Sequence, residues 1–432
     1  MHHKSGILGG LILAVALGVM FLGCSKDESS TSPPAATTIT VTGKVVNVNN
    51  RPVSGVPVVV AGIPSVNTDA NGAFTIAGVT SPYSITVIDG TNKQAIVYRG
   101  LTRTDPTLEY IEFNPSTNHT AGLSGKIYPA TNYPEPLGRK TQVAFVSPEV
   151  TRSALANGTT GAYTMVAVPW YGSSTTAGTI YALQWSYNTT TSLPTEYNGY
   201  GSRSGITLLD ATNNPNGNDT MSVLTSGSFS GTATPAANYT ISTKTLSLKV
   251  GGTGIIELLT DGTSTGSFTY VTPAIAGATL YLQVTAAKTG VGAVTAVKAG
   301  LDPNASGVSI SMPAAPELSL PINGTTGVTK STLFSWTPFT GGVHMLWVTG
   351  PAGKPRYYII TAAVGDSIPD LASAGLGLPL STNYSWEVYG FAPYASTDGA
   401  TGPNGFLGGL TAPSATDVSI GLSISRTFTT AP

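Results

Sequence analysis

Cysteine is nearly absent from this sequence, because Cys24 is the only one among 432 residues. A single thiol cannot form a disulfide within the chain. The folded part must therefore be stabilised by buried apolar surface rather than by covalent cross-links. The chain is also too long for one hydrophobic core, so we expect several domains.

Charged residues are scarce as well. Asp, Glu, Lys and Arg make up 9% of the chain, with 20 basic against 21 acidic residues. Without a basic excess there is no field to attract nucleic acid or an anionic membrane surface, so we expect no nucleic-acid partner. The polar surface has to come from Thr, Ser, Asn and Gly, a mixture common in extracellular β proteins.

Residues with catalytic chemistry are few or badly placed. Beyond the first three residues the only histidines are His119 and His344, and neither belongs to a closely spaced His and Glu set of the kind that binds catalytic zinc. Most acidic residues adjoin Gly, Asn or Pro, where capping a turn is a plainer role than glycosidase chemistry. The sequence predicts no enzyme activity, no cofactor and no metal.

Helical periodicity is missing after residue 23. Short alternating runs rich in Val, Ile, Thr and Tyr are separated instead by Gly, Asn, Asp and Pro. The 51 glycines and 30 prolines follow no triplet period, which excludes collagen. This pattern predicts an all-β chain of tandem Ig-like or prealbumin-like sandwiches, and the prolines at the junctions predict an extended multidomain arrangement.

The first residues have the three parts of a secretory signal: a polar start with Lys4, an apolar run over 6–23, and a small residue before Cys24. Phe21-Leu22-Gly23-Cys24 resembles the lipobox of bacterial lipoproteins. The resemblance implies cleavage of a signal peptide, residues 1–23, and a lipid on the Cys24 thiol. An uncleaved anchor helix is the alternative, since a run of this length can span a bilayer. In both cases the remainder is exported and tethered.

Residues 24–38 are rich in Ser and Pro without periodicity and predict a flexible tether. Ser25, directly after the cysteine, fits sorting to the outer membrane. Ser25-Lys26-Asp27-Glu28 resembles the charged tag that directs lipoproteins to the cell surface in Bacteroidota-like bacteria, with a solvated charge cluster as the alternative. These resemblances imply a lipid-anchored, surface-exposed protein of the bacterial outer membrane.

The clearest domain pattern begins at Ile39, and we assign the first sandwich to residues 39–117. Alternating valines predict two strands, and Asp69-Ala70-Asn71-Gly72 predicts the tight turn that precedes a further strand. The spacing over residues 39–90 resembles the carboxypeptidase regulatory-like domain, a seven-stranded Ig-like sandwich. The positions that carry the resemblance are Gly43, Val45, Pro52, Gly55, Val58, Thr68, Asp69, Gly72, Phe74 and Tyr83.

Two glycine landmarks of this domain recur along the chain. Each consists of a glycine in the first strand and a second glycine before an aromatic residue, at separations of 29, 36 and 35 residues: Gly43 and Gly72, Gly125 and Gly161, Gly231 and Gly266. Differences in spacing belong in loops, which tolerate insertions. The recurrence predicts a second, diverged sandwich over 118–226 and a third over 227–312.

The last segment, 313–432, has a different pattern. An early Leu-Phe-Ser-Trp336 and a late Tyr-Ser-Trp386-Glu-Val resemble a fibronectin type III-like module. The resemblance implies that the two tryptophan elements lie in facing sheets and pack on each other. Residues 426–430 suit the last strand of such a module.

Aromatic residues crowd the second sandwich. We expect Tyr163 and Tyr181 in its core, because they occupy the repeat positions of Phe74 and Tyr83. Four others lie in loop-like stretches and are candidates for stacking on a sugar or a protein partner, with ordinary packing as the alternative: Trp170, Tyr171, Tyr197 and Tyr200.

Three functions remain open at this point. The first is a structural, adhesive or display role on the cell surface. The second is carbohydrate binding for glycan capture, a pattern known from starch-utilisation lipoproteins, with the four aromatic candidates as the platform. The third is an accessory subunit of a secreted hydrolase.

Overall fold

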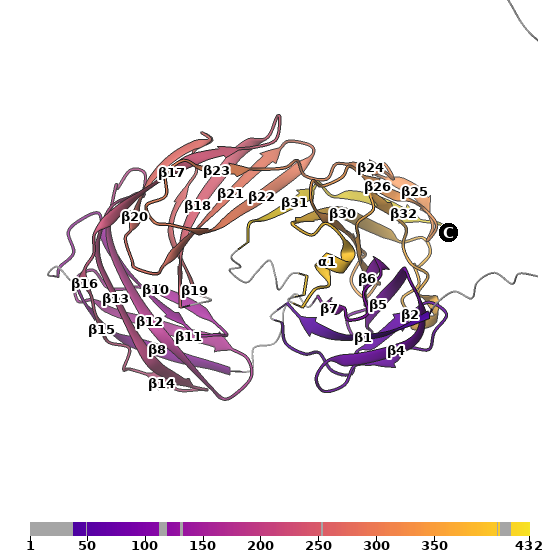
Figure 1. Cartoon of the computed structure of the whole chain (residues 1–432), viewed down its shortest axis with the longest axis horizontal. Coiled ribbons are helices and arrows are strands. Elements are labelled where there is room, and N and C mark those ends of the chain that lie inside the picture. Colours follow the sequence, from indigo (N-terminus) through magenta and orange to yellow (C-terminus); the bar gives the residue numbers. More distant parts are fainter. Residues whose placement is uncertain are drawn as a thin grey trace, which may run out of the picture. The chain divides into compact units, whose positions relative to one another are not determined.

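The computed structural model describes residues 38–48, 50–111, 119–129, 133–251, 254–403, 405–406 and 416–432. Within these ranges the elements are β-strands, apart from the one-turn helix α1 (Thr397–Ala400) and a 3-10 turn at Ala372–Ala374 (Figure 1). The prediction of an all-β chain is confirmed.

The first module, residues 38–111, contains β1 (Thr38–Asn47), β2 (Pro57–Val60), β3 (Val66–Asn67), β4 (Ala73–Thr80), β5 (Tyr83–Asp89), β6 (Gln94–Leu101) and β7 (Thr107–Tyr110). One sheet has the order β4-β1-β7, with β1 antiparallel to β4 and parallel to β7. The facing strands follow the order β6-β5-β2-β3. Before β4, the Asp69 Oδ1 atom accepts the N–H groups of Asn71 and Ala73 at 2.8 Å each, as the turn chemistry predicts.

The second module, residues 119–223, has longer strands. They are β8 (His119–Tyr128), β9 (Arg139–Val146), β10 (Thr151–Leu155), β11 (Ala162–Trp170), β12 (Thr175–Tyr187), β13 (Pro194–Leu209), β14 (Asn213–Asn214), β15 (Asp219–Thr220) and β16 (Ser222–Val223). One sheet has the order β11-β8-β14, with β15 also paired to β8, and the facing sheet has the order β10-β9-β12-β13-β16.

The third module, residues 226–311, repeats the arrangement of the first. Its strands are β17 (Ser226–Thr234), β18 (Thr240–Val250), β19 (Gly254–Asp261), β20 (Ser267–Pro273), β21 (Thr279–Lys288), β22 (Gly292–Leu301) and β23 (Val308–Ser311). The short sheet is β20-β17-β23, and the facing strands follow the order β19-β18-β21-β22.

The glycine landmarks occupy equivalent positions in these three modules. In each, the strand glycine is paired directly with the aromatic residue: Gly43 with Phe74, Gly125 with Tyr163 and Gly231 with Phe268. A Cβ atom on the glycine before the aromatic would come within 2.4 Å of a carbonyl oxygen on the first strand in all three cases. Close backbone approach therefore explains why the landmark requires glycine.

The fourth module, residues 318–432, combines short and long strands. They are β24 (Leu318–Leu320), β25 (Thr325–Val328), β26 (Phe334–Trp336), β27 (Val343–Thr349), β28 (Arg356–Thr361), β29 (Gly365–Asp366), β30 (Asn383–Ala392), β31 (Val418–Ser423) and β32 (Arg426–Thr430). Trp336 on β26 and Trp386 on β30 lie in different sheets and share one core, where the Phe334 and Trp386 rings meet edge to face at 5.1 Å. This is the packing that the sequence pattern predicts.

Strands from different modules join into one sheet. Among the described residues, β22 of the third module pairs with β31, and β28 pairs in parallel with β6 of the first module. The resulting order is β19-β18-β21-β22-β31-β30-β27-β28-β6-β5-β2-β3. In an extended row, only modules that follow each other in the sequence would be in contact. The pairing of β6 in the first module with β28 in the fourth departs from this prediction.

The joined part of the sheet is buried on both faces. Ile96, Tyr98, Tyr358 and Ile360 belong to one core, which also contains Phe74 of the β4-β1-β7 sheet. Their strand neighbours belong to a second core, which lies against β24-β26-β29 and contains Ala95, Val97, Tyr357 and Ile359. The first and fourth modules therefore form three β layers around two cores. Strands buried on both faces have continuous apolar runs rather than alternation, as in Ala95–Tyr98 and Tyr357–Ile360.

The second and third modules meet through side chains. Leu183, Trp185 and Tyr197 of the second module belong to the same apolar core as Phe229 and Leu282 of the third. None of the strand pairings of the described residues links the two modules. Packing of side chains, rather than a shared sheet, holds this pair together.

Candidate functional site

The predicted anchor lies outside the described residues. Cys24, the signal peptide 1–23 and the tether 24–38, except for its last residue, are not part of them. In the part of the chain that the structure describes, no helix is long and apolar enough to cross a membrane. Lipidation of Cys24 stays a prediction.

Two of the four aromatic candidates are buried, which contradicts their placement in loops. Trp170 is the last residue of β11, is 0% exposed and stacks on the His119 ring at 5.6 Å. Tyr197 lies in β13, is 1% exposed and packs beside Trp185 in the core that the second and third modules share. The flanking Gly and Asn residues made these segments resemble loops, but β11 extends as far as Trp170 and β13 includes Tyr197. Neither side chain can stack on a ligand.

The other two candidates are half-buried and lie apart. Tyr171 follows β11, and the Arg51 guanidinium lies 5.2 Å from its ring centroid, next to the Arg51–Glu149 ion pair of 3.0 Å. Tyr200 lies in β13 with its ring stacked on Tyr181 at 6.5 Å. The four aromatics therefore do not form one platform.

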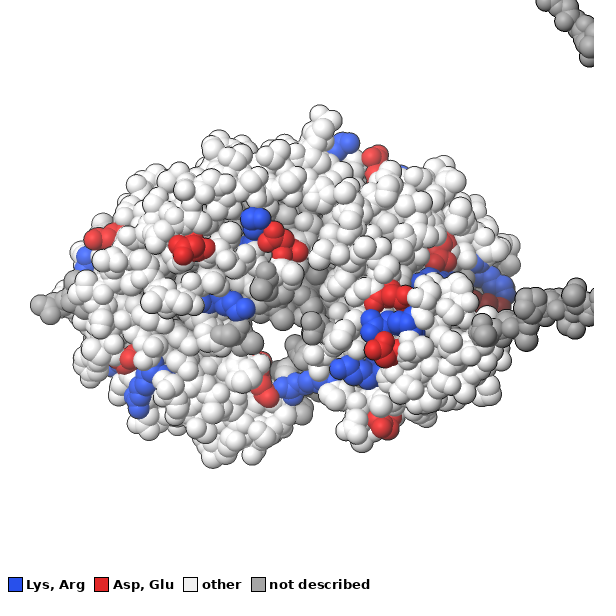
Figure 2. Space-filling view, viewed as in Figure 1, with Lys and Arg blue, Asp and Glu red and all other residues white. Residues whose placement is uncertain are grey.

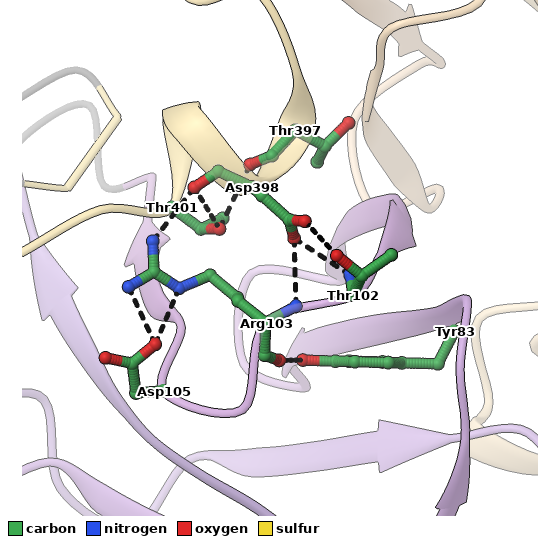
Figure 3. Close-up of polar contacts among 7 residues, drawn as sticks. All are labelled: Tyr83, Thr102, Arg103, Asp105, Thr397, Asp398 and Thr401. Carbon is green, nitrogen blue, oxygen red and sulfur yellow. Dashed lines mark hydrogen bonds and ion pairs between the residues drawn. The ribbon is translucent and has the colours of Figure 1, made fainter. Parts of the chain in front are cut away.

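A polar latch connects the first module to helix α1 of the fourth, and it is drawn in Figure 3. The Asp398 Oδ1 atom accepts the N–H groups of Thr102 and Arg103 at 2.9 and 3.2 Å, and its Oδ2 atom accepts the Thr102 hydroxyl. Arg103 in turn donates from Nη1 to the Asp398 carbonyl oxygen at 2.9 Å and from Nη2 to Asp105 at 2.8 Å. Tyr83 donates its hydroxyl to the Arg103 carbonyl at 2.6 Å. The latch thus uses side chains and backbone from both modules.

The electrostatics of the latch favour its charged form. Partial burial of Asp398 opposes ionisation, but the hydrogen bonds from Thr102 and Arg103, together with the Arg103 charge, outweigh it and hold the pKa of this carboxyl below its ordinary value. Two further contacts extend the joint, an Arg99–Asp366 ion pair of 3.2 Å and a hydrogen bond from Lys93 Nζ to the Gly353 carbonyl of 2.9 Å.

Apolar packing lies directly beside the latch. Phe406, which follows α1, is fully buried and meets the Phe391 ring edge to face at 4.7 Å. Ala400 of α1 and Phe406 both belong to the core of the first module. Sequence reasoning did not identify these residues. The sequence feature that could have indicated this buried contact is Phe406 itself, an aromatic residue in a Gly-rich segment.

The two histidines have opposite environments. His344 is buried and accepts the Phe339 N–H at 2.9 Å through Nε2, and its burial lowers the pKa to about 4. His119 has its Nδ1 atom 3.0 Å from Asp210 and its Nε2 atom 3.0 Å from the Gly172 carbonyl. The hydrogen bond with Asp210 raises the pKa of His119. Both histidines serve packing or turn contacts, as expected for isolated ones.

One charged pair is buried inside the third module. Lys244 is 0% exposed and lies 3.2 Å from Asp261, and its Nζ atom also donates to the carbonyl oxygens of Thr263 and Thr265. Tyr270 donates its hydroxyl to Asp261 at 2.7 Å. Each charge therefore has several partners, which is how proteins tolerate buried ions.

The Asn-rich segment over residues 213–219 uses its side chains for backbone contacts. Asn214 accepts the Asn216 N–H at 2.9 Å, and Asn218 accepts the Lys126 N–H at 2.8 Å. No group of three or more His, Cys, Asp or Glu able to hold a metal ion occurs within the described ranges. Figure 2 shows Lys, Arg, Asp and Glu in small groups on a mostly uncharged face.

No family model and no curated protein sequence matches the chain. Among solved structures, the Bacillus anthracis TIE protein is 10% identical with a TM-score of 0.16, and the match covers 64% of this chain and 50% of that one.

The fimbrial anchor protein Mfa2 from Porphyromonas gingivalis is 12% identical with a TM-score of 0.17, over 41% of this chain and 78% of that one. The FN1–FN3 domains of chicken CNTN1 are 11% identical with a TM-score of 0.17, over 72% of this chain and 99% of that one.

Proposed function

We propose that this chain is a non-enzymatic, lipid-anchored protein of the bacterial cell surface, with a structural, adhesive or display role. The observation that carries the proposal is the position of β1. It is the first described strand after the predicted tether, and it is hydrogen-bonded on both sides, to β4 and to β7. Ladder bonds run across the strands, so a pull along β1 loads two ladders at once.

The joint between the first and fourth modules also supports this role. A tethered display protein needs modules that stay in register when the tether is loaded. The parallel pairing of β6 with β28, the two cores on either face of the joined sheet and the Asp398 latch together resist separation. Most of the described aromatic and charged side chains discussed above serve packing and internal contacts.

The family assignments belong to the same proposal. We assign residues 39–117 to the carboxypeptidase regulatory-like domains and 313–432 to the fibronectin type III-like modules, on the sequence patterns given above. The expected partners are the membrane, through the Cys24 lipid, and a protein or glycan at the cell surface.

Metabolic labelling tests the anchor. The full chain, expressed in a Gram-negative host, should incorporate labelled palmitate, and Cys24→Ala should not. Ser25→Ala is the matched control and should keep the label. Antibody against the purified chain should stain intact cells as strongly as permeabilised ones. Label that persists in Cys24→Ala would remove the lipid anchor, and staining only after permeabilisation would remove the surface location.

A further inference from the structure

A cleft with three tyrosines lies between the second and third modules. Its volume is about 530 Å³, within the range of small-ligand sites. Tyr181 on β12 and Tyr200 on β13 come from the second module, and Tyr281 on β21 comes from the third. Tyr181 and Tyr281 are the repeat-equivalent aromatics of their modules. We call this cavity the tyrosine cleft.

The tyrosine rings are held by the core beneath them. Tyr181 and Tyr200 are partly buried, stack with 27° between their planes and pack against the core shared by both modules. Gly251 lies at the hydroxyl end of Tyr181, where any side chain would come within 2.6 Å of the Tyr181 oxygen. The prediction that Tyr181 is a core residue is therefore only half right, because part of its ring faces the cleft.

The rim of the tyrosine cleft is open and polar. Ser202 and Ala276 are exposed, and Thr279 contributes a further hydroxyl. Gly277 has a φ of 74°, with nothing within 4 Å of the place where a Cβ would be. Hydroxyls and accessible backbone at the rim, above aromatic rings at the floor, are the two features that recognise a sugar ring, whose C–H faces stack and whose hydroxyls form hydrogen bonds.

The charge of the lining restricts the ligand. None of the residues that line the cleft is acidic, and Lys249, the only basic one, already interacts within the chain. The shared core also fixes the two walls relative to each other, so little ordering is needed on binding. From these features we propose that the tyrosine cleft binds a neutral oligosaccharide. This goes beyond the structural role and moves glycan binding away from Trp170 and Tyr197.

Binding by the full chain, purified in detergent, tests the proposal. An array of neutral and acidic oligosaccharides identifies the ligand, and titration calorimetry measures its affinity. Tyr200→Ala should weaken binding about tenfold, as expected for the loss of one stacked ring. Ser202→Trp fills the cleft from its exposed rim and should abolish binding without removing a core contact.

Tyr128→Ala is the matched control, because Tyr128 is an exposed tyrosine of the same module outside the cleft, and it should bind as the wild type does. If Tyr200→Ala fails to fold, Ser202→Trp decides the question. The proposal is overturned if the wild type binds no neutral oligosaccharide, or if Ser202→Trp keeps the wild-type affinity. Palmitate labelling of Cys24 is unaffected by either result, so the lipid-anchor proposal and the cleft proposal can be contradicted independently.

Discussion

Two of the inter-module joints in the described part of the chain are built by different means. The first and fourth modules share a sheet through β6 and β28, with apolar cores on both of its faces and a polar latch at its side. The second and third modules share a core through Trp185 and Tyr197 but no strand pairing among the described residues. The tyrosine cleft lies at this second joint, where side-chain packing joins the two walls.

The comparison predicts that a single charge buried in the first joint lowers the free energy of unfolding at least as much as a truncation in the second joint. Val97 is 1% exposed, pairs with Ile359 and lies in the core of the fourth module. Val97→Asp should lower the free energy of unfolding by about 4 kcal/mol or more, because it buries an unpaired carboxylate. Urea denaturation measures the change.

Val166→Asp is the control for this substitution, since Val166 is 84% exposed and should tolerate the charge within about 0.5 kcal/mol. Equal stability of the two variants would mean that the first and fourth modules do not share a core.

Truncation in the second joint should have the next largest effect. Trp185 is 2% exposed and packs with Tyr197 in the shared core. Trp185→Ala should cost about 3–5 kcal/mol and uncouple the second module from the third, so that denaturation followed by fluorescence and by circular dichroism no longer coincides. Leu155→Ala removes a 60% exposed side chain and should leave one coincident transition.

Lowering the pH should selectively reduce the stability of the first and fourth modules, which form the first joint. His344 of the fourth module has its pKa lowered from 6.5 to about 4 by burial, so between these values the unfolded chain binds a proton that the folded chain does not. The stabilising contribution of neutral His344 is therefore fully present above pH 6.5. As the pH is lowered it is lost, and at pH 5 the free energy of unfolding is about 2 kcal/mol smaller. His344→Gln should remove that part of the loss, as measured by urea denaturation at pH 7.5 and 5.

The contribution of His119 in the second module to stability should change with pH in the opposite direction. Asp210 raises its pKa, so its contribution is complete below 6.5 and is lost as the pH rises through the folded-state pKa. An NMR titration of both histidines checks the two directions. Titration of His344 near 6.5 would contradict its burial.

Of the features compared, the polar latch should contribute least to the free energy of unfolding. Asp398→Ala removes a carboxylate that accepts from Thr102 and Arg103, and should lower the free energy of unfolding by about 1–2 kcal/mol, since the site is only partly buried. The matched control is Asp370→Ala, because Asp370 forms an exposed ion pair with Lys330, and its loss should lower the free energy of unfolding by less than Asp398→Ala does. If the two substitutions cost the same, Asp398 is an ordinary surface carboxylate.

Local patterns carried much of the fold prediction. Alternation on β1, the Asp69 turn, the paired glycine and aromatic landmarks and the two tryptophan elements are all properties of short segments, and each occupies the expected place. The candidate site was less predictable. Trp170 and Tyr197 lie near Gly, Ser and Asn, which are typical of loops, yet Trp170 is the last residue of β11 and Tyr197 lies within β13, and both side chains are buried.

The all-β class and local features such as β1 and the Asp69 turn were determined by the sequence alone, because a period of two and turn residues act through neighbours along the chain. Only the tertiary structure decided that β6 pairs with β28. Continuous apolar runs such as Ala95–Tyr98 require burial on both faces, but they do not say which distant segment provides the second layer. The same holds for the tyrosine cleft, whose walls come from separate modules.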